Sequence, residues 1–173
     1  MRIRAATEAD YAAIAKVHVD SWRTTYSGIL PQEYLDQLSC QQREQMWRDI
    51  LSTPGPAFTL LVQEAGGEVV GFASGGLERT GDPLFRGDLL AIYLLQAYQG
   101  KGLGRLLIRA VVERLLGQGI GSLLVWVLAQ NPSRRFYERL GAERVKERSI
   151  VLGGADLVEV AYGWRDAGVL LQP

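Results

Sequence analysis

Cysteine is almost missing from this sequence: Cys40 is the only one in 173 residues, which excludes a disulfide within the chain. Long apolar runs are missing too, and the longest ones are far too short to span a bilayer. No basic and apolar leader precedes Arg2. Charge of one sign is not in excess, because 19 lysines and arginines balance 19 aspartates and glutamates. These absences favour a cytoplasmic protein that binds neither nucleic acid nor a membrane.

The remaining composition predicts one globular domain over residues 1–173. Hydrophobic residues make up 47% of the chain, which is enough for a substantial core at this length. No internal repeat or linker divides the sequence. Only residues 168–173 are expected to form a loose tail.

Hydrophobic periodicity predicts an α/β protein in which strands and helices alternate. The expected strands cover residues 2–5, 57–63, 69–74, 89–95, 123–128, 145–152 and 157–164. Helices are expected to begin after Thr7–Asp10, at Pro31 and after Ser39, and to cover 103–115 and 134–140. The strand, helix and strand that follow one another over 89–128 imply a parallel crossover, whereas the last two strands pair as a hairpin.

A glycine-rich loop lies between the fourth expected strand and the helix that follows it. Gly100, Gly102 and Gly104 stand at alternate positions, so the backbone can turn tightly and expose bare N–H groups to a ligand. Lys101 and Arg105 lie at the N-terminus of the helix, where the helix dipole normally favours acidic residues. Cations at this position are explained if a phosphate group binds there. The loop therefore predicts a site for a phosphate-bearing ligand.

Two familiar phosphate-binding loops do not match. No Gly-Lys-Ser or Gly-Lys-Thr ending is present to hold the magnesium ion of a nucleoside triphosphate, which excludes a P-loop. The dinucleotide fingerprint requires a third glycine where Arg105 stands, and it normally follows the first strand of a domain. A different kind of phosphate site is needed.

The segment Gln99–Gly104 resembles the Q-x-x-G-x-G signature with which the GNAT superfamily of N-acetyltransferases binds the pyrophosphate of acetyl-CoA. A second segment, Asn131–Gly141, resembles the N-…-F-Y-E-x-x-G element that closes most of these domains, although its asparagine and tyrosine are one residue closer than usual. The resemblance covers nearly the whole chain. It implies a GNAT fold, with a central twisted mixed β-sheet, helices on both faces, and central parallel strands that part to admit acetyl-CoA. It also implies a metal-free enzyme that acetylates a primary amine.

The resemblance also indicates which residues hold acetyl-CoA. Pyrophosphate contacts are expected from the loop and its flanks: Gln99, Gly100, Lys101, Gly102, Leu103, Gly104 and Arg105. Main-chain groups of Ile92, Tyr93 and Leu94 are expected to bind the pantetheine arm and to polarise the thioester carbonyl. Asn131 stands where the superfamily has an asparagine that contacts pantetheine. Arg134 is a candidate for the 3′-phosphate, or simply a surface arginine.

Tyr137 is the expected general acid. In the superfamily, the tyrosine of the second element lies beside the CoA sulfur. A phenol with an ordinary pKa of about 10 can protonate a departing thiolate whose thiol has a pKa of roughly 8.5. The alternative is that Tyr137 only packs beneath its helix.

Three candidates remain for the base that removes the proton of the amine: Asp88, an ordered water and Tyr26. By period two, Asp88 shares a strand face with Ile92 and Leu94, and it stands where histone-type members carry a glutamate that works through water. The alternative for Asp88 is a solvated residue at the start of a strand. A glutamate that other members carry on the next strand is replaced here by Trp126.

The acceptor is expected against a helical wall, with Trp22 and Tyr26 as substrate-binding residues, unless these rings only pack the helices together. The only histidine, His18, has the spacing of a core or groove residue and takes no part in the expected chemistry. Direct transfer in a ternary complex is favoured, because Cys40 lacks a partnering base for an acetyl-cysteine route. The resemblance implies a homodimer, and the sequence does not identify the amine.

Two other functions stay open. The chain is alternatively a sensor or regulatory module that binds acyl-CoA without turnover, or an interaction protein on a former enzyme scaffold. The intact glycine-rich loop, with its cations at Lys101 and Arg105, argues against the second.

Overall fold

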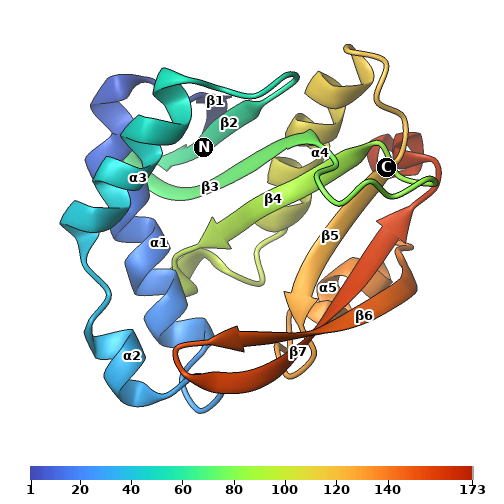
Figure 1. The fold of residues 1–173 in the computed structure, drawn as a ribbon. Coiled ribbons are helices and arrows are strands. Elements are labelled where there is room, and N and C mark those ends of the chain that lie inside the picture. Colours follow the sequence, from blue (N-terminus) through green and yellow to red (C-terminus); the bar gives the residue numbers. More distant parts are fainter. Residues whose placement is uncertain (173) are drawn as a thin grey trace.

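The computed structural model describes residues 1–172, which form one seven-stranded sheet with helices against it (Figure 1). The strands are β1 (Arg2–Ala5), β2 (Thr59–Ala65), β3 (Glu68–Leu77), β4 (Gly87–Leu94), β5 (Leu123–Leu128), β6 (Glu143–Leu152) and β7 (Ala155–Trp164). The helices are α1 (Tyr11–Thr25), α2 (Gln32–Asp36), α3 (Cys40–Ser52), α4 (Leu103–Leu116) and α5 (Arg134–Arg139), with 3-10 turns η1 (Glu8–Asp10), η2 (Gln96–Tyr98) and η3 (Ala167–Leu171). The strand order is β1-β2-β3-β4-β5-β7-β6.

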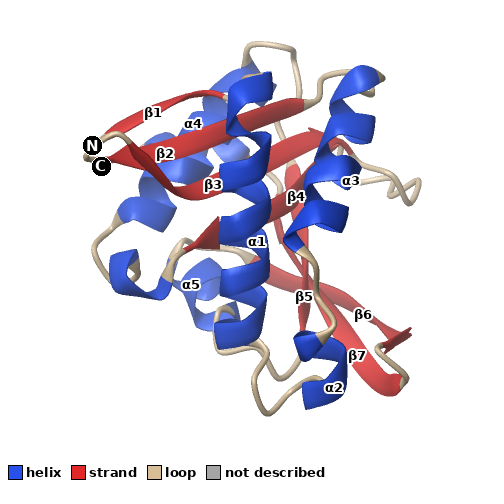
Figure 2. Ribbon diagram, turned by 90° about the vertical axis from the view of Figure 1, so that its left-hand side faces the viewer, coloured by secondary structure: helices blue, strands red, loops and turns tan. Residues whose placement is uncertain are grey.

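Helices cover both faces of the sheet (Figure 2). The front layer consists of α1 and α3, and the back layer consists of α4 and α5. Side chains alternate accordingly along the strands, because successive residues of a strand point to opposite faces. Val62 and Phe72 pack in the cluster of the front layer, whereas their neighbours Leu61 and Ala73 pack in the cluster of the back layer. The predicted α/β fold with a mixed sheet is confirmed.

Helix α4 buries one stripe of its surface against the sheet. Its buried residues are Leu103, Leu107, Ile108, Val111, Val112 and Leu115. Burying each such side chain contributes about 1.5–3 kcal/mol to folding, so the helix holds the preceding glycine-rich loop in a fixed place. Helix α4 has 14 residues, and within residues 1–172 no helix is both long and apolar enough to cross a membrane.

Strands β4 and β5 are parallel neighbours that pair only at their first residues. The register joins Gly87 to Leu123 and Asp88 to Leu124, and the described residues form no further pair between these strands. Beyond this point the two strands diverge, as Figure 1 shows. The central parallel strands therefore part, as the resemblance implied.

A β-bulge interrupts β4 beside this gap. Ser74 of β3 pairs with Ala91, but the next residue, Gly75, pairs with Leu89, so Leu90 has no partner on β3. A bulge inserts one extra residue into a strand and shifts the alternation of its side chains. Counting every second residue along β4 therefore does not keep side chains on one face when the count crosses the bulge.

The end of the chain packs on α4, which shows that the predicted loose tail is wrong for residues 168–172. The N–H of Ala167 donates to the carbonyl of Gly121 at 2.8 Å, and Leu170 is only 3% exposed. The guanidinium of Arg105 donates to the carbonyl of Gln172 at 2.9 Å. The apolar residues of this segment contribute to the core, and this explains why the tail is ordered. Pro173 lies outside the described residues.

Candidate active site

The glycine-rich loop presents a row of free backbone donors at the N-terminus of α4. Gly100 and Gly102 have φ angles of 71° and 78°, which non-glycine residues rarely adopt. Within residues 1–172, no protein group accepts a hydrogen bond from the N–H groups of residues 100–104; the first amide of this region to donate is that of Arg105, to the carbonyl of Gly102. Open space surrounds the Cβ positions of both glycines. The loop therefore fits an anion such as a pyrophosphate.

Gly104, Lys101 and Arg105 each contact a neighbouring part of the structure beside the loop. A Cβ atom on Gly104 would lie 3.2 Å from the ring of Phe136, so this glycine lets α4 and α5 approach each other. Lys101 is exposed and lies over the ring of Tyr98, 5.5 Å from its centroid. Arg105 is also exposed, with one nitrogen bound to Gln172. Both predicted cations are therefore beside the free amides.

The gap between β4 and β5 contains a cavity of about 90 Å³. The N–H of Leu95 donates to Val70 on β3, and since alternate residues of a strand direct their backbone groups to opposite sides, Ile92 and Leu94 direct theirs into the gap. The carbonyl of Leu94 accepts from the amide of Gln99 at 2.9 Å. The gap thus exposes the edge of β4 to a ligand that binds as an additional strand.

Three tyrosines line this gap: Tyr26, Tyr93 and Tyr137. Tyr26 and Tyr137 are 8% and 6% exposed. Burial raises the pKa of all three phenols above the ordinary value, and the proximity of Tyr93 raises the pKa of Tyr26 and of Tyr137 further. All three hydroxyls therefore keep their protons at neutral pH and can donate them.

The other predicted cofactor residues lie at the N-terminus of α5, Asn131 just before the helix and Arg134 at its first position. Asn131 lines the gap and is 4% exposed, and its side-chain oxygen accepts from the N–H of Ser133 at 2.9 Å. Arg134 is on α5, half-buried and outside the lining of the gap. Within residues 1–172 no group accepts from its Nε atom. The structure thus brings Asn131 to the gap but not Arg134.

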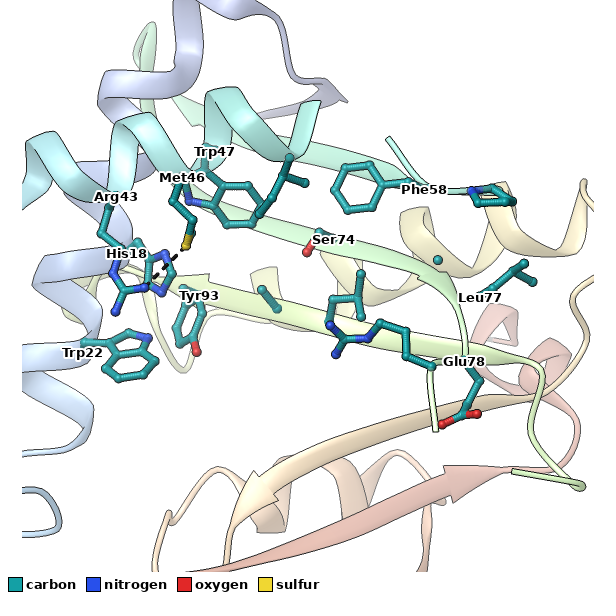
Figure 3. Close-up of a pocket in the computed structure, with 17 residues that line it drawn as sticks. His18, Trp22, Arg43, Met46, Trp47, Phe58, Ser74, Leu77, Glu78 and Tyr93 are labelled. Carbon is teal, nitrogen blue, oxygen red and sulfur yellow. Dashed lines mark hydrogen bonds between the residues drawn. The ribbon is translucent and has the colours of Figure 1, made fainter. Parts of the chain in front are cut away.

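A second, larger cavity of about 460 Å³ lies between the front helices and strands β3 and β4 (Figure 3). Its aromatic lining residues are His18, Trp22, Trp47, Phe58 and Tyr93. Its charged lining residues are Arg43, Glu78 and Arg79. We call it the front cavity. The predicted substrate-binding residue Trp22 lines it, whereas Tyr26 lines the gap.

The β-bulge makes the front cavity and the gap share a wall. Leu90, Ala91 and Tyr93 line both spaces. Leu90 and Ala91 are adjacent in sequence, yet both reach the front cavity, because the bulge shifts the alternation of β4 between them. A ligand in one space therefore lies next to a ligand in the other.

Asp88 shares the face of Leu90 but not that of Ile92 and Leu94, which corrects the prediction from period two. Asp88 pairs with Gly76, whose Cβ position faces Leu90 on the front side. Ile92 and Leu94 pack in the cluster of the back layer. The bulge is the cause, since it lies between Asp88 and these residues.

Asp88 is buried beneath an arginine. It is 2% exposed and accepts from Nε of Arg79 at 3.3 Å. Burial raises its pKa, while the charge of Arg79 opposes this rise. Asp88 lines neither the gap nor the front cavity. The described residues, moreover, bring no three histidine, cysteine, aspartate or glutamate side chains together as ligands for a metal ion.

Sequence reasoning missed Arg43 and the side chain of Tyr93. Arg43 lies over Trp22, with its guanidinium carbon 5.1 Å from the ring centroid. Its position four residues before Trp47 on one helix was the available signal, because such residues share a helical face. The side chain of Tyr93 had no signal of this kind, since the bulge decides which way it points.

The model of the acetyltransferase (GNAT) family matches residues 14–142. An uncharacterised N-acetyltransferase of Bacillus subtilis, YuaI, is 43% identical over 168 residues, which are 97% of this chain and 95% of YuaI. The L-amino acid N-acyltransferase MnaT of Escherichia coli is 29% identical over 142 residues, which are 82% of this chain and 78% of MnaT.

A solved structure shows the same fold. The structure of PaiA N-acetyltransferase from Thermoplasma acidophilum, in complex with coenzyme A, matches with a TM-score of 0.69 and 22% identity, over 92% of this chain and 96% of that chain. The family match confirms the enzyme class predicted from the two motifs, an acetyltransferase that uses acetyl-CoA. This chain belongs to the acetyltransferase (GNAT) family.

Proposed function

We propose that this protein transfers the acetyl group of acetyl-CoA directly to a primary amine, with the thioester in the gap and the amine in the front cavity. The observation that carries the proposal is the shared wall of Leu90, Ala91 and Tyr93. Because these residues line both spaces, a thioester in the gap and an amine in the front cavity would meet at this part of β4. Holding the two reacting groups close together lowers the entropic part of the activation barrier. The name of MnaT, an L-amino acid N-acyltransferase, supports a small-molecule acceptor.

The glycine-rich loop would bind the pyrophosphate of acetyl-CoA. The free N–H groups of residues 100–104 supply neutral donors, and Lys101 and Arg105 add positive charge. Gln99 lies at the junction of the loop and the gap, where its amide already binds the carbonyl of Leu94. PaiA N-acetyltransferase, which has the same fold, was solved in complex with coenzyme A, and this supports CoA as the ligand. Arg134 is retained as a candidate for the 3′-phosphate, since α5 packs against the start of α4 at Gly104.

Tyr137 would act as the general acid. The neutral amine attacks the carbonyl carbon of the thioester. The carbonyl oxygen would accept a hydrogen bond from the backbone N–H of Leu94. A C–N bond forms and the C–S bond breaks. The electron pair of the broken bond leaves on sulfur, which takes the phenolic proton of Tyr137 and becomes the thiol of CoA. The nitrogen releases one proton to water, and the phenol regains one from water. The products are the N-acetyl amine and CoA.

Water is the base that the geometry favours among the three candidates. Glu78 is the carboxylate that lines the front cavity, but its oxygens already accept from the N–H groups of Thr80 at 2.7 Å and Asp82 at 2.9 Å. Asp88 lines neither space and would act only through a water. The raised pKa of Tyr26 makes its phenolate scarce. The amine would therefore bind in its neutral form.

A transfer assay tests this proposal. Purified protein is incubated with acetyl-CoA and a panel of primary amines, and thiol release is followed together with the mass of the amine. We expect thiol release that depends on the amine and a mass increase of one acetyl group. Binding of acetyl-CoA without transfer to any amine would instead identify a sensor of acyl-CoA. Absence of acetyl-CoA binding would contradict both functions.

We further propose that the chain works in the cytoplasm as a single domain that forms a homodimer. The exposed Cys40 has no second cysteine to pair with in the chain, which agrees with a reducing compartment. Apolar side chains on the hairpin of β6 and β7 support an interface, since Val151 is 71% and Val158 is 40% exposed. Light scattering after gel filtration tests the dimer, and fractionation of cells tests the location.

A further inference from the structure

We propose that the front cavity selects an amine that also carries a carboxylate and an apolar side chain, and that Arg43 binds the carboxylate. The compound class is therefore an α-amino acid with an apolar or thioether side chain. This inference deepens the proposed function and rests on it.

Arg43 is an unpaired positive charge in the wall of an apolar cavity. Within residues 1–172, no carboxylate lies within 4.0 Å of its guanidinium, and its one side-chain hydrogen bond is to the sulfur of Met46, at 3.5 Å. The second guanidinium of the cavity, that of Arg79, is already compensated by Asp88. A half-buried cation without a partner is poorly solvated, so an anionic ligand group beside Arg43 is favoured.

Other polar atoms in the residues that line the front cavity also lack partners. Ser74 is 1% exposed and Trp47 is 4% exposed, and both line the front cavity. Within residues 1–172, no group is hydrogen-bonded to Oγ of Ser74, Nε1 of Trp47 or Nδ1 of His18. An indole N–H only donates, and a hydroxyl can donate. Together with the guanidinium, these donors suit a ligand group rich in acceptor oxygens, such as a carboxylate.

The position of Arg43 relative to Tyr93 favours an α-amino acid. Figure 3 shows Arg43, His18 and Tyr93 together at one end of the cavity, and His18 stacks on Tyr93. The positive charge of Arg43 accordingly lowers the pKa of Tyr93 and of His18. In an α-amino acid one carbon separates the carboxylate from the amine. A carboxylate at Arg43 therefore places the amine near Tyr93, in the wall shared with the gap.

The rest of the cavity is suited to an apolar side chain. Beyond Arg43 it is lined by Trp47, Ile50, Phe58 and Leu90, and its volume of about 460 Å³ is within the range of small-molecule sites. A polyamine is disfavoured, because Arg79 is paired with Asp88, the carboxylate of Glu78 is bound by backbone amides, and Arg43 leaves an uncompensated positive charge in the lining. The lining thus favours a ligand with one apolar side chain over a ligand that carries additional positive charges.

Matched acceptors test the inference. Methionine and phenylalanine are each compared with their primary amides and with the amines that remain after decarboxylation, at equal concentrations of neutral amine. We expect kcat/KM to be at least about tenfold higher for the amino acids. Arg43→Met should lower kcat/KM about ten- to a hundredfold for the amino acids, mainly through KM, and leave the amides and amines unchanged. Arg43→Lys should retain part of the selectivity.

Arg48→Met is the matched control. Arg48 lies on the same helix, is exposed, and stands over the ring of Tyr11 at 5.5 Å, much as Arg43 stands over Trp22. It does not line the cavity, so this variant should keep the wild-type selectivity. Equal kcat/KM for acids, amides and amines, unchanged in Arg43→Met, would overturn the inference and leave the proposed function standing. Binding of acetyl-CoA without transfer to any of these amines would overturn the proposed function, and this inference with it.

Discussion

The ring of His18 stacks on the ring of Tyr93, with centroids 5.1 Å apart and planes inclined by 19°. His18 lines the front cavity, whereas Tyr93 lines both this cavity and the gap. The stacked pair therefore connects the helical wall with the strand that carries the bulge. Burial, together with the nearby positive charge of Arg43, lowers the pKa of His18 to about 3. His18 is neutral at physiological pH.

The neutral state of His18 predicts that the protein loses stability as the pH falls below about 6.5, the ordinary pKa of histidine. Because the unfolded state takes up this proton first, the free energy of unfolding decreases with falling pH until the folded pKa of about 3 is reached. One pH unit below 6.5, the loss is roughly 1 kcal/mol. Urea denaturation of wild type and His18→Gln at about pH 7 and pH 5.5 measures it.

The comparison of the two proteins isolates the contribution of His18. Other groups, such as Asp88 with its raised pKa, also titrate on acidification, but they are present in both proteins. The His18→Gln variant should show the smaller loss of stability between the two pH values. The same loss in both proteins would show that His18 does not remain neutral in the folded state.

Tyr137→Phe is expected to lower kcat by about a hundredfold, with little change in KM, because general acid catalysis contributes on the order of 10²–10⁴. The ring is buried beside Phe136 and Trp164, and the substitution removes only the hydroxyl, so the fold should be kept. Thiol release at saturating acetyl-CoA measures kcat. Tyr26→Phe is the matched control, since it removes another buried hydroxyl from the same gap. A larger loss in Tyr26→Phe would reassign the acid.

Asp88→Asn should lower kcat less than about tenfold and leave the pH dependence of kcat/KM unchanged. Asp88 lines neither cavity, and its carboxylate is bound to Arg79. With water as the base, kcat/KM should rise with the fraction of neutral amine. A pH–rate profile of wild type and variant with one amine is the measurement. A loss of a hundredfold or more, together with a changed profile, would assign the base to Asp88.

The parts of the fold that depend on local patterns could be predicted from the sequence. The spacing of apolar residues located α4, and the alternate glycines of residues 100–104 located the turn before it, because these features are set within a few residues of chain. The closing hairpin was predicted across Gly153 and Gly154, which have the positive φ angles that a tight turn requires. The two family motifs, at these glycines and at Asn131–Gly141, led to the correct family.

Features that depend on pairing between distant segments could not be predicted. Period two placed Asp88 on the face of Ile92, but the bulge opposite Ser74 and Gly75 reversed this relation. A bulge depends on how β4 pairs with β3, and its own residues carry no clear signal. The front cavity is another example, since Arg43 and Tyr93 are fifty positions apart in the sequence. The tail was expected to be loose because nothing local showed that Leu170 would reach the core.

The measurement that tests the central claim most directly is a calorimetric titration of acetyl-CoA into wild type, Gly102→Trp and Gly119→Trp. Gly102 and Gly119 have φ angles of 78° and 77° with open space around them, so tryptophan imposes a similar strain at either end of α4. Only Gly102 lies in the loop assigned to the pyrophosphate. We predict micromolar-range binding by wild type and Gly119→Trp, and none by folded Gly102→Trp. No heat with wild type, or equal binding by both variants, would contradict the proposed site.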